Sequence, residues 1–353
     1  MRLLDRYIAN AIIGGVAITL FVLLALFAFI GFVDELDAVG RGNYGLWQAI
    51  QYLFLSLIPV AYQLFPIAAL VGCIMGLGGL ASHGELIAMR AAGVSLNRLL
   101  WSVSKVGLLM VFVVLLLGEG VAPYAEESAQ KLRSEAITGK ISLQGEQGMW
   151  AKDEREFIRV RDIIMADQLA NITLYQFSEN NQLLSATTAA RAFYKEDQWQ
   201  LQDVEVVSFT GGAAVSRLAQ QAWQTSLDPE MIEVVQLDPD SQSMWGLYQY
   251  INYLQENAIA SGRYEMAFWG KVVTPLVTLI MMMLAVPFVM GSLRTISISQ
   301  RIFVGTLVGL GFQLLNQASN YVGLVFGFNA PLSAFLPAII ISIVAGFLIR
   351  RLR

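Results

Sequence analysis

Long uncharged apolar stretches constrain this chain more than any other feature of its sequence. A helix that crosses a membrane needs about 20 mostly apolar residues, and the chain holds several uncharged stretches of at least that length. We place the spans of the first half at residues 7–33, at 56–81 within a longer run from 42 to 84, and at 99–121. The second half contains residues 272–293 and a run from 302 to 349.

The last run is about twice as long as one span. Its middle contains turn residues, which are Gly323, Gly327, Asn329 and Pro331, and it therefore predicts a helical hairpin. Six spans result, three on each side of an insertion. With 56% hydrophobic and 14% charged residues, the composition excludes an ordinary soluble protein, and the net charge of −4 argues against a nucleic-acid partner.

Basic residues are sorted between the short connections in a way that predicts the orientation of the spans. On one side of the membrane, the short connections hold a single basic residue, Arg41, which lies beside the acidic residues Asp34, Glu35 and Asp37. This bias predicts that both termini are cytoplasmic and that the insertion lies outside the cytoplasm. The basic residues of the other side are Arg2, Arg6, Arg90, Arg98, Lys105, Arg294, Arg301, Arg350, Arg351 and Arg353.

The insertion shows the alternation of apolar and polar residues that is typical of β-strands. It alternates at residues 157–161, 172–177, 189–194 and 199–209, which predicts an all-β domain built as a small sandwich, an open barrel or a jelly roll. After it, Ser243 is placed to cap a helix that leads back to the membrane.

The predicted fold is a membrane α-helical bundle of six transmembrane helices with an inserted all-β, jellyroll-like domain. We expect spans one to three in residues 1–122, with a short cytoplasmic helix near 82–95. The β domain takes residues 123–265, and spans four to six take 266–353.

The sequence carries no recognisable catalytic motif. The pairs Gly139-Lys140 and Gly270-Lys271 lack the other residues of a phosphate-binding loop, and there is no H-E-x-x-H or G-x-S-x-G pattern. The single cysteine, Cys73, and single histidine, His83, cannot form a disulfide framework or a Cys/His metal cluster. We therefore expect a non-catalytic subunit without a cofactor of its own.

The cytoplasmic connection between spans two and three, residues 81–100, is the most informative segment. Glu85 and Met89 lie one helical turn apart, Arg90 follows, and Gly93 is suited to ending a short helix. One interpretation is a solvated loop. The other is a coupling helix that docks on an ATPase, with Glu85 paired to an arginine there.

Span five carries amide side chains at helical spacing. Gln313, Asn316, Gln317 and Asn320 share one helical face, which must contact protein or water rather than lipid. They serve either as hydrogen-bonding contacts between helices or as the lining of a polar cavity. Pairs of buried acidic and basic residues are nearly absent from the predicted spans, since Glu119 and Lys105 lie toward span ends.

Six short motifs give the whole chain a resemblance to a known family. They are L-L-D-R-Y-I at the start, F-V-D-E-L after span one, F-P-I-A-A-L in span two, G-E-L-I-A-M-R-A-A-G in the cytoplasmic connection, G-E-G-V-A-P at the end of span three, and G-M-W-A-K-D at the start of the β domain. Together these motifs resemble the LptF/LptG family, the permease subunits of the lipopolysaccharide exporter of Gram-negative bacteria.

The resemblance implies an inner-membrane ABC exporter subunit that extracts lipopolysaccharide and passes it through a periplasmic β-jellyroll toward the outer membrane. It implies a heterodimer with LptF on a dimer of the ATPase LptB, and delivery to LptC and then LptA. Glu85 matches the glutamate that docks on the ATPase, with Met89 and Arg90 beside it. Spans one and five are expected to form lateral gates.

The same resemblance suggests residues that contact the lipid. The cavity would be lined by Phe65, Met282 and Leu310 together with the four amides of span five. Arg41 and Arg133 are expected to contact lipid phosphates, although the acidic cluster near Arg41 could instead bind divalent cations that bridge them. The apolar positions Ile158, Val160, Leu174 and Phe193 form either a plain core of the β domain or a path for acyl chains.

Two other functions remain as alternatives. A scaffold subunit would transmit the motion of an ATPase to the β domain without carrying a substrate, but the polar residues of span five favour transport. An ion-coupled carrier is disfavoured because it needs ionisable pairs inside the membrane.

Overall fold

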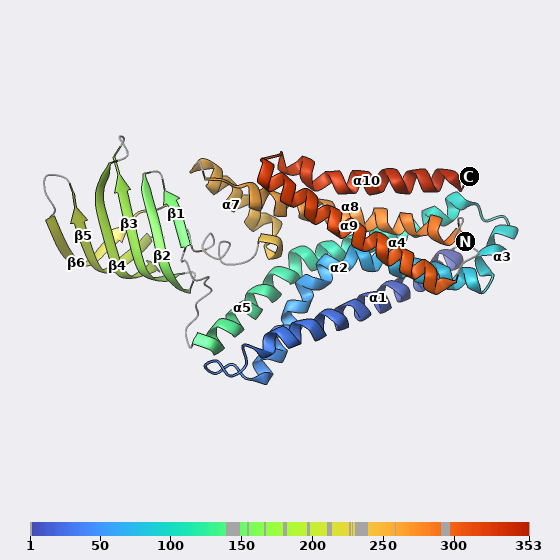
Figure 1. The fold of residues 1–353 in the computed structure, drawn as a ribbon, viewed down its shortest axis with the longest axis horizontal. Helices are drawn as coiled ribbons and strands as arrows, with labels where there is room; N and C mark the ends of the chain where they lie inside the picture. The colour runs from blue at the N-terminus through green and yellow to red at the C-terminus, as the bar shows by residue number, and fades with distance from the viewer. Residues whose placement is uncertain are drawn as a thin grey trace. The chain divides into compact units, whose positions relative to one another are not determined.

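The computed structural model describes residues 2–138, 149–153, 155–165, 167–178, 182–195, 198–209, 214–225, 227, 229, 239–257, 259–290 and 297–352. The chain forms two compact units (Figure 1). The first unit contains Met1–Val33, Ser56–Ala125 and Gly262–Arg353. The second contains Asp34–Leu55 and Glu126–Ser261, with a β-sheet.

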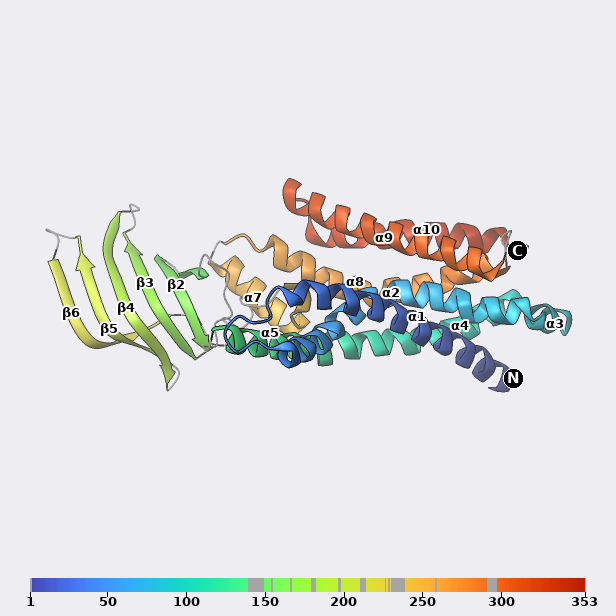
Figure 2. The same cartoon turned by 60° about the horizontal axis from the view of Figure 1, so that its bottom comes forward.

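Six long apolar helical segments confirm the predicted membrane bundle, by their length and composition. The two termini and the short helix α3 (Glu85–Ala91) lie at the same end of the helical unit (Figures 1 and 2). The long helices are α1 (Arg2–Leu36), α2 (Leu46–Ser82), α4 (Leu96–Leu115) with its continuations η1 (Leu116–Val121) and α5 (Ala122–Thr138), α8 (Gly262–Met290), α9 (Ile298–Phe326) and α10 (Ala330–Arg351).

The predicted hairpin is present as α9 and α10, which lie side by side in both views (Figures 1 and 2). Gly327 ends α9 with a φ of 65°, in the left-handed region that glycine adopts readily, and Asn329 precedes α10. Gly323 lies inside α9 rather than in the turn. A Cβ at this position would lie 2.4 Å from Ser333 Oγ of α10, so Gly323 allows the close approach of the two helices.

Glycines also bring α1 and α2 into backbone contact. A Cβ on Gly15 would lie 2.2 Å from the carbonyl oxygen of Gly72, and one on Gly76 would lie 2.4 Å from the carbonyl oxygen of Ala11. The motif Gly72-x-x-x-Gly76 therefore packs against α1, as small residues do where helices cross closely. Around this contact, buried side chains of α1, α2, α4 and α8 form one apolar core.

The β domain is confirmed as a single antiparallel sheet in which every strand pairs with its neighbour in sequence. The strand order β1-β2-β3-β4-β5-β6 is a meander. Figure 2 shows β2 to β6 in this order. They are β1 (Met149–Asp153), β2 (Glu156–Met165), β3 (Gln168–Phe177), β4 (Leu183–Lys195), β5 (Gln198–Ser208) and β6 (Ala214–Trp223).

Helix α7 (Met244–Glu256) follows the short helix η2 (Pro239–Ser241). Ser243 caps α7 as predicted, because its hydroxyl accepts a 3.1 Å hydrogen bond from the backbone N–H of Gly246. The apolar face of α7 includes the buried residues Leu247, Ile251 and Leu254.

Candidate functional sites

Helix α3 has well-defined ends in the connection between spans two and three. It begins after Gly84, which has a φ of 76°, and the N–H of Val94 donates to the carbonyl of Met89 beyond its last turn. Gly93 has a φ of 91° and its N–H donates to the carbonyl of Arg90. These bonds form a Schellman motif, so Gly93 ends the short helix in the way its sequence position suggested.

The three residues expected to contact an ATPase differ in exposure along α3. Glu85 is half-buried at the first position of the helix and accepts a 2.7 Å hydrogen bond from the Tyr7 hydroxyl of α1. Met89 is half-buried against the apolar core, and Arg90 is exposed. A negative charge at the start of a helix is favoured by the helix dipole, and Tyr7 adds a directional contact to it.

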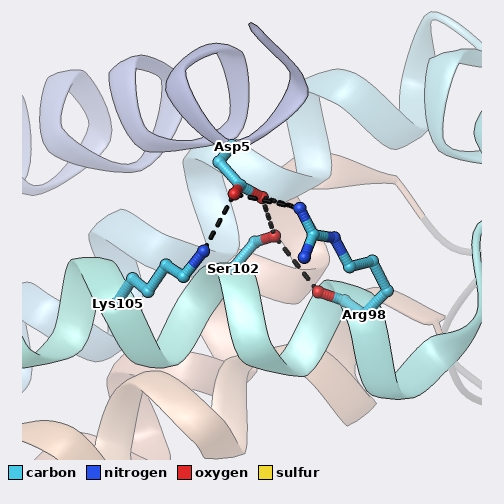
Figure 3. A network of polar contacts seen from close by, with 4 residues as sticks. All are labelled: Asp5, Arg98, Ser102 and Lys105. Carbon is cyan, nitrogen blue, oxygen red and sulfur yellow. Dashed lines mark hydrogen bonds and ion pairs between the residues drawn. The ribbon is translucent and has the colours of Figure 1, made fainter. Parts of the chain in front are cut away.

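A polar network joins α1 to α4 near the same end (Figure 3). The Asp5 carboxylate accepts hydrogen bonds from Arg98 at 3.0 and 3.1 Å, from Ser102 at 2.6 Å and from Lys105 at 2.9 Å. The sequence analysis used Arg98 and Lys105 as markers of orientation and predicted no contact for either of them. The structure gives them a second role, because their charges hold the start of α1 against α4.

A cavity of about 640 Å³ lies beside α3. Leu86, Ile87 and Arg90 of α3 line one side of it, and Val289 of α8 and Arg301 of α9 lie among its other lining residues. The cavity therefore lies between the short helix α3 and the ends of α8 and α9.

The amides of α9 make no hydrogen bond to another helix within the part of the chain that the structure describes. Gln313, Asn316 and Asn320 are half-buried and Gln317 is exposed, and none donates to or accepts from another described helix. The Oδ1 atom of Asn320 is buried without a hydrogen-bond partner among the described residues. A buried amide oxygen in this condition is costly unless another molecule supplies a donor.

The apolar residues expected near the lipid are divided between core and surface. Phe65 of α2 and Met282 of α8 are buried in the helical core, whereas Leu310 of α9 is half exposed. Contact of a lipid with Phe65 or Met282 therefore requires the surrounding helices to separate.

Arg133 of α5 contacts the last turn of α1 and the first turns of α2. Its Nε donates a 2.8 Å hydrogen bond to the Glu35 carboxylate, and its guanidinium lies 5.3 Å from the ring centroid of Tyr52. Burial, and secondly the Glu35 carboxylate, raise the pKa of the Tyr44 hydroxyl. Arg41 is exposed.

The connection between α1 and α2 is fixed against α5 by its backbone. The N–H of Asn43 donates to the carbonyl of Ala136 at 2.7 Å, and a Cβ on Gly42 would lie 2.3 Å from the carbonyl oxygen of Ile137. Among the described residues no group of three or more His, Cys, Asp or Glu side chains is placed to hold a metal ion, and Glu35 of the acidic cluster pairs with Arg133.

Three of the four predicted acyl-path residues lie together on the sheet. Ile158 and Val160 of β2 are fully buried, and Leu174 of β3 pairs directly with Ile158. Leu174 also lines an open cavity of about 1000 Å³ with Leu201 and Trp223. This cavity has both polar and apolar side chains along its wall.

Phe193 is not brought onto this buried face. It is half-buried, and its neighbour Ala192 is fully buried in place of the expected residue. The alternation of buried and exposed side chains shifts by one residue in β4. At this point the adjacent strands carry Asn171 and Asp203, whose φ values of 52° and 53° interrupt the regular pleat.

A buried lysine makes a further ionic contact that the sequence analysis did not predict. Lys271 of α8 is only 4% exposed, and its Nζ lies 3.4 Å from the Glu119 carboxylate and donates to the carbonyl of Gly118 at 2.8 Å. This pair is one that the expectation of nearly absent pairs did not name. The signal was a lysine inside an apolar stretch, which was considered only as part of an incomplete phosphate loop.

Comparison with known proteins agrees with this architecture. The family "Lipopolysaccharide export system permease LptF/LptG" matches residues 6–351. The chain is 34% identical to the lipopolysaccharide export system permease protein LptG of Escherichia coli (strain K12), over 99% of this chain and 98% of that protein. It is also 34% identical to the protein of the same name from Haemophilus influenzae, over 99% of both chains.

Both relatives carry the LptG name, which the L-D-R-Y start and the G-M-W-A-K-D motif also favour over LptF. The match extends over all six apolar helical segments and the sheet between them. This chain therefore belongs to the LptF/LptG family of lipopolysaccharide export system permeases.

Proposed function

We propose that this chain is the LptG-type permease subunit of an ATP-driven exporter that extracts lipopolysaccharide from the inner membrane. It pairs with LptF, and a dimer of the ATPase LptB supplies the energy. The chain itself binds no cofactor, because ATP and Mg²⁺ bind to LptB. Lipopolysaccharide leaves the bundle through the β domain and passes to LptC and LptA.

The proposed orientation places both termini in the cytoplasm and the sheet in the periplasm. Its support is the distribution of basic residues, which favours one side of the membrane. The termini lie at the end of the helical unit that also carries α3 (Figure 1). A cytoplasmic α3 is accessible to an ATPase, and we assign Glu85, Met89 and Arg90 to that contact.

The amide face of α9 is the observation that most favours transport over a scaffold role. Four amides lie on one face of a helix of membrane-spanning length, and Asn320 keeps a buried oxygen without a donor from the described residues. A scaffold needs no such face, whereas the sugar hydroxyls near a lipid headgroup supply hydrogen-bond donors. We assign this face to the substrate cavity, with Leu310 beside it and with Phe65 and Met282 reached when the helices separate.

The other residues that we assign to the substrate fit its two chemical parts, the phosphate groups and the acyl chains. Arg41 and Arg133 supply positive charge for lipid phosphates. Ile158, Val160 and Leu174 supply a buried apolar surface for acyl chains, and Leu174 reaches the open cavity of the sheet. Phe193 has no assigned contact with the substrate, since it leaves the buried face.

Site-specific photo-crosslinking in the assembled exporter tests this function. A crosslinker at Gln317 and another at Leu174 should capture lipopolysaccharide only when ATP is supplied. Leu315 is the matched control on α9, because two residues correspond to about 200° around a helix axis. Tyr175 is the control on β3, because adjacent strand residues point to opposite faces.

Capture at neither Gln317 nor Leu174 would exclude the transport function. If the sheet still moves when ATP is supplied but neither position captures lipopolysaccharide, the scaffold alternative is supported. Equal capture at the test and control positions would show non-specific contact with lipid and would contradict the proposed path.

A further inference from the structure

The third span is interrupted by a π-helical turn at η1 (Leu116–Val121), between α4 and α5. A π turn contains more residues than an α turn, and such turns inside helices are rare and frequently occur at functional sites. The N–H of Ala122 donates to the carbonyl of Leu117, five residues earlier, which is the π pattern.

Pro123 explains why the turn forms here. A proline inside a helix lacks an N–H, and its ring conflicts with the carbonyl of the residue four positions earlier, which is Glu119. The π pattern would pair the Gly118 carbonyl with the N–H of residue 123, which proline does not have. The N–H of Ala122 is already used by Leu117. The backbone therefore leaves the Gly118 carbonyl without its regular donor.

Lys271 supplies that donor from another helix. Its Nζ lies 2.8 Å from the Gly118 carbonyl oxygen, and the side chain is 4% exposed. The ammonium also lies 5.3 Å from the ring centroid of Tyr62, and this ring covers Gly118 so closely that an added Cβ would lie 2.4 Å from it. Residues of α2, α8 and the third span thus meet at the Gly118 carbonyl, which has no regular donor because Pro123 lacks an N–H.

The chemical nature of the donor is informative. An ammonium group inside a membrane-spanning bundle is costly, and polar residues there are usually retained for a function. The Glu119 carboxylate at 3.4 Å offsets part of the charge. Helix α5 begins at Ala122, directly after the turn, so the contact made by Lys271 lies where the third span continues into α5.

We propose that Lys271 is a positioning residue for transport: it completes the hydrogen bonding of a proline hinge in the third span and so sets the direction of α5. Helix α5 precedes the β domain in the chain. The inference deepens the proposed function by naming the hinge through which the bundle orients that segment. Its structural part stands on the contacts at Gly118 alone.

Distance measurements between spin labels test the hinge in the full chain within its complex. The reporter pair carries cysteines at Ser128 of α5 and Leu276 of α8, and the control pair carries them at Trp101 of α4 and Leu276; all three positions are exposed. Cys73, the only native cysteine, is fully buried and does not need removal. Lys271→Met should shift or broaden the reporter distance and leave the control distance unchanged.

A second substitution makes the test specific. Lys271→Met alone should also lose lipopolysaccharide transfer. Pro123→Ala restores a backbone N–H at the hinge. The double variant Lys271→Met with Pro123→Ala should therefore recover both a single narrow reporter distance and the transfer. Pro337→Ala, in α10, is the matched control and should rescue neither. Lys271→Arg keeps the charge and the N–H donors and should resemble the unsubstituted protein.

Each result bears on one part of the inference. An unchanged reporter distance in Lys271→Met would overturn it, and so would equal rescue by Pro337→Ala. If Lys271→Met alone fails to fold, the double variant with Pro123→Ala must fold, or the inference is wrong. Altered distances with full transfer would reject the role in transport. Absence of transfer in the unsubstituted complex would instead reject the proposed function, and the distances would still test the hinge.

Discussion

The hydroxyl of Tyr7 in α1 donates a 2.7 Å hydrogen bond to the Glu85 carboxylate at the first residue of α3. This bond connects the first span to the short helix that we assign to ATPase contact. We expect Tyr7→Phe to lower the ATPase activity of the assembled complex several-fold, because the carboxylate loses a contact that orients it. Glu85→Ala should lower it further and release LptB.

Tyr248→Phe is the matched control, because Tyr248 is an exposed tyrosine of α7. It should leave ATPase activity and LptB retention unchanged. Full activity in Tyr7→Phe would show that Glu85 needs no orientation from α1.

The Asp5 network should contribute measurably to the stability of the bundle. Asp5→Asn removes the charge that pairs with Arg98 and Lys105, and we expect a loss of about 1 kcal/mol in the free energy of unfolding, since the network is partly exposed. Thermal unfolding in detergent measures this change. Glu127→Gln breaks an i,i+4 pair with Lys131 within α5 and should cost less. An equal loss of unfolding free energy in Asp5→Asn and Glu127→Gln would contradict a special contribution of the Asp5 network.

The contact between α1 and α2 should tolerate no side chain at Gly72. A Cβ there would lie 2.4 Å from Val16 Cα, so Gly72→Ala must push the two helices apart. Overpacking of this kind costs about 1–3 kcal/mol in the free energy of unfolding. Gly79→Ala is the control in the same helix, where no atom lies within 4 Å of the added Cβ. A stable Gly72→Ala variant would contradict the close backbone contact.

The assignment of Arg41 and Arg133 to lipid phosphates predicts a loss of lipid response on charge reversal. Arg41→Glu and Arg133→Glu should each reduce the stimulation of ATPase activity by lipopolysaccharide. Glu35→Gln breaks the ion pair but keeps the Arg133 guanidinium, and it should retain the stimulation. Arg217→Glu, an exposed charge reversal on β6, should have no effect. Unchanged stimulation in both arginine variants would refute the assignment.

Glu156 should make the stability of the sheet depend on pH. Burial raises the pKa of its carboxyl above the ordinary value, although a 3.0 Å hydrogen bond from Trp223 Nε1 opposes this effect. The folded state therefore binds the proton more tightly than the unfolded state. The resulting stability is present below the ordinary pKa and is lost as the pH rises through the raised value.

Hydrogen exchange of β2 and β6 amides in the full chain measures this dependence. Glu156→Gln has no proton to lose, so protection in the unsubstituted protein should fall relative to the variant as the pH rises from about 4 to 7. The same ratio at every pH would contradict the raised pKa.

Features that depend on local sequence were predicted well. The six spans follow from apolar stretches, and strands β2 to β5 follow from alternation, because each property is readable within one segment. Strands β1 and β6 were not predicted. β1 has five residues, and nearly every side chain of β6 is exposed, so neither shows the two-sided pattern that marks a half-buried strand.

The position of Phe193 shows where alternation fails. The sequence pattern assumes a regular pleat, but Asn171 and Asp203 adopt positive φ values in the strands on either side of β4. A local conformation of this kind changes which residues face inward. The sequence places Asn and Asp at these sites without indicating that they leave the β region.

The sequence by itself determined the class of the protein, the number of spans and the family resemblance, because composition and short motifs carry that information. Only the tertiary structure decided that Gly72 meets α1, that Asp5 gathers Arg98 and Lys105, and that Lys271 reaches the carbonyl left over by Pro123. These pairs join different helices, and their members lie far apart in the sequence, as with Gly118 and Lys271, which are separated by 153 positions. Helix packing brings them together, and no periodicity within one segment specifies that packing.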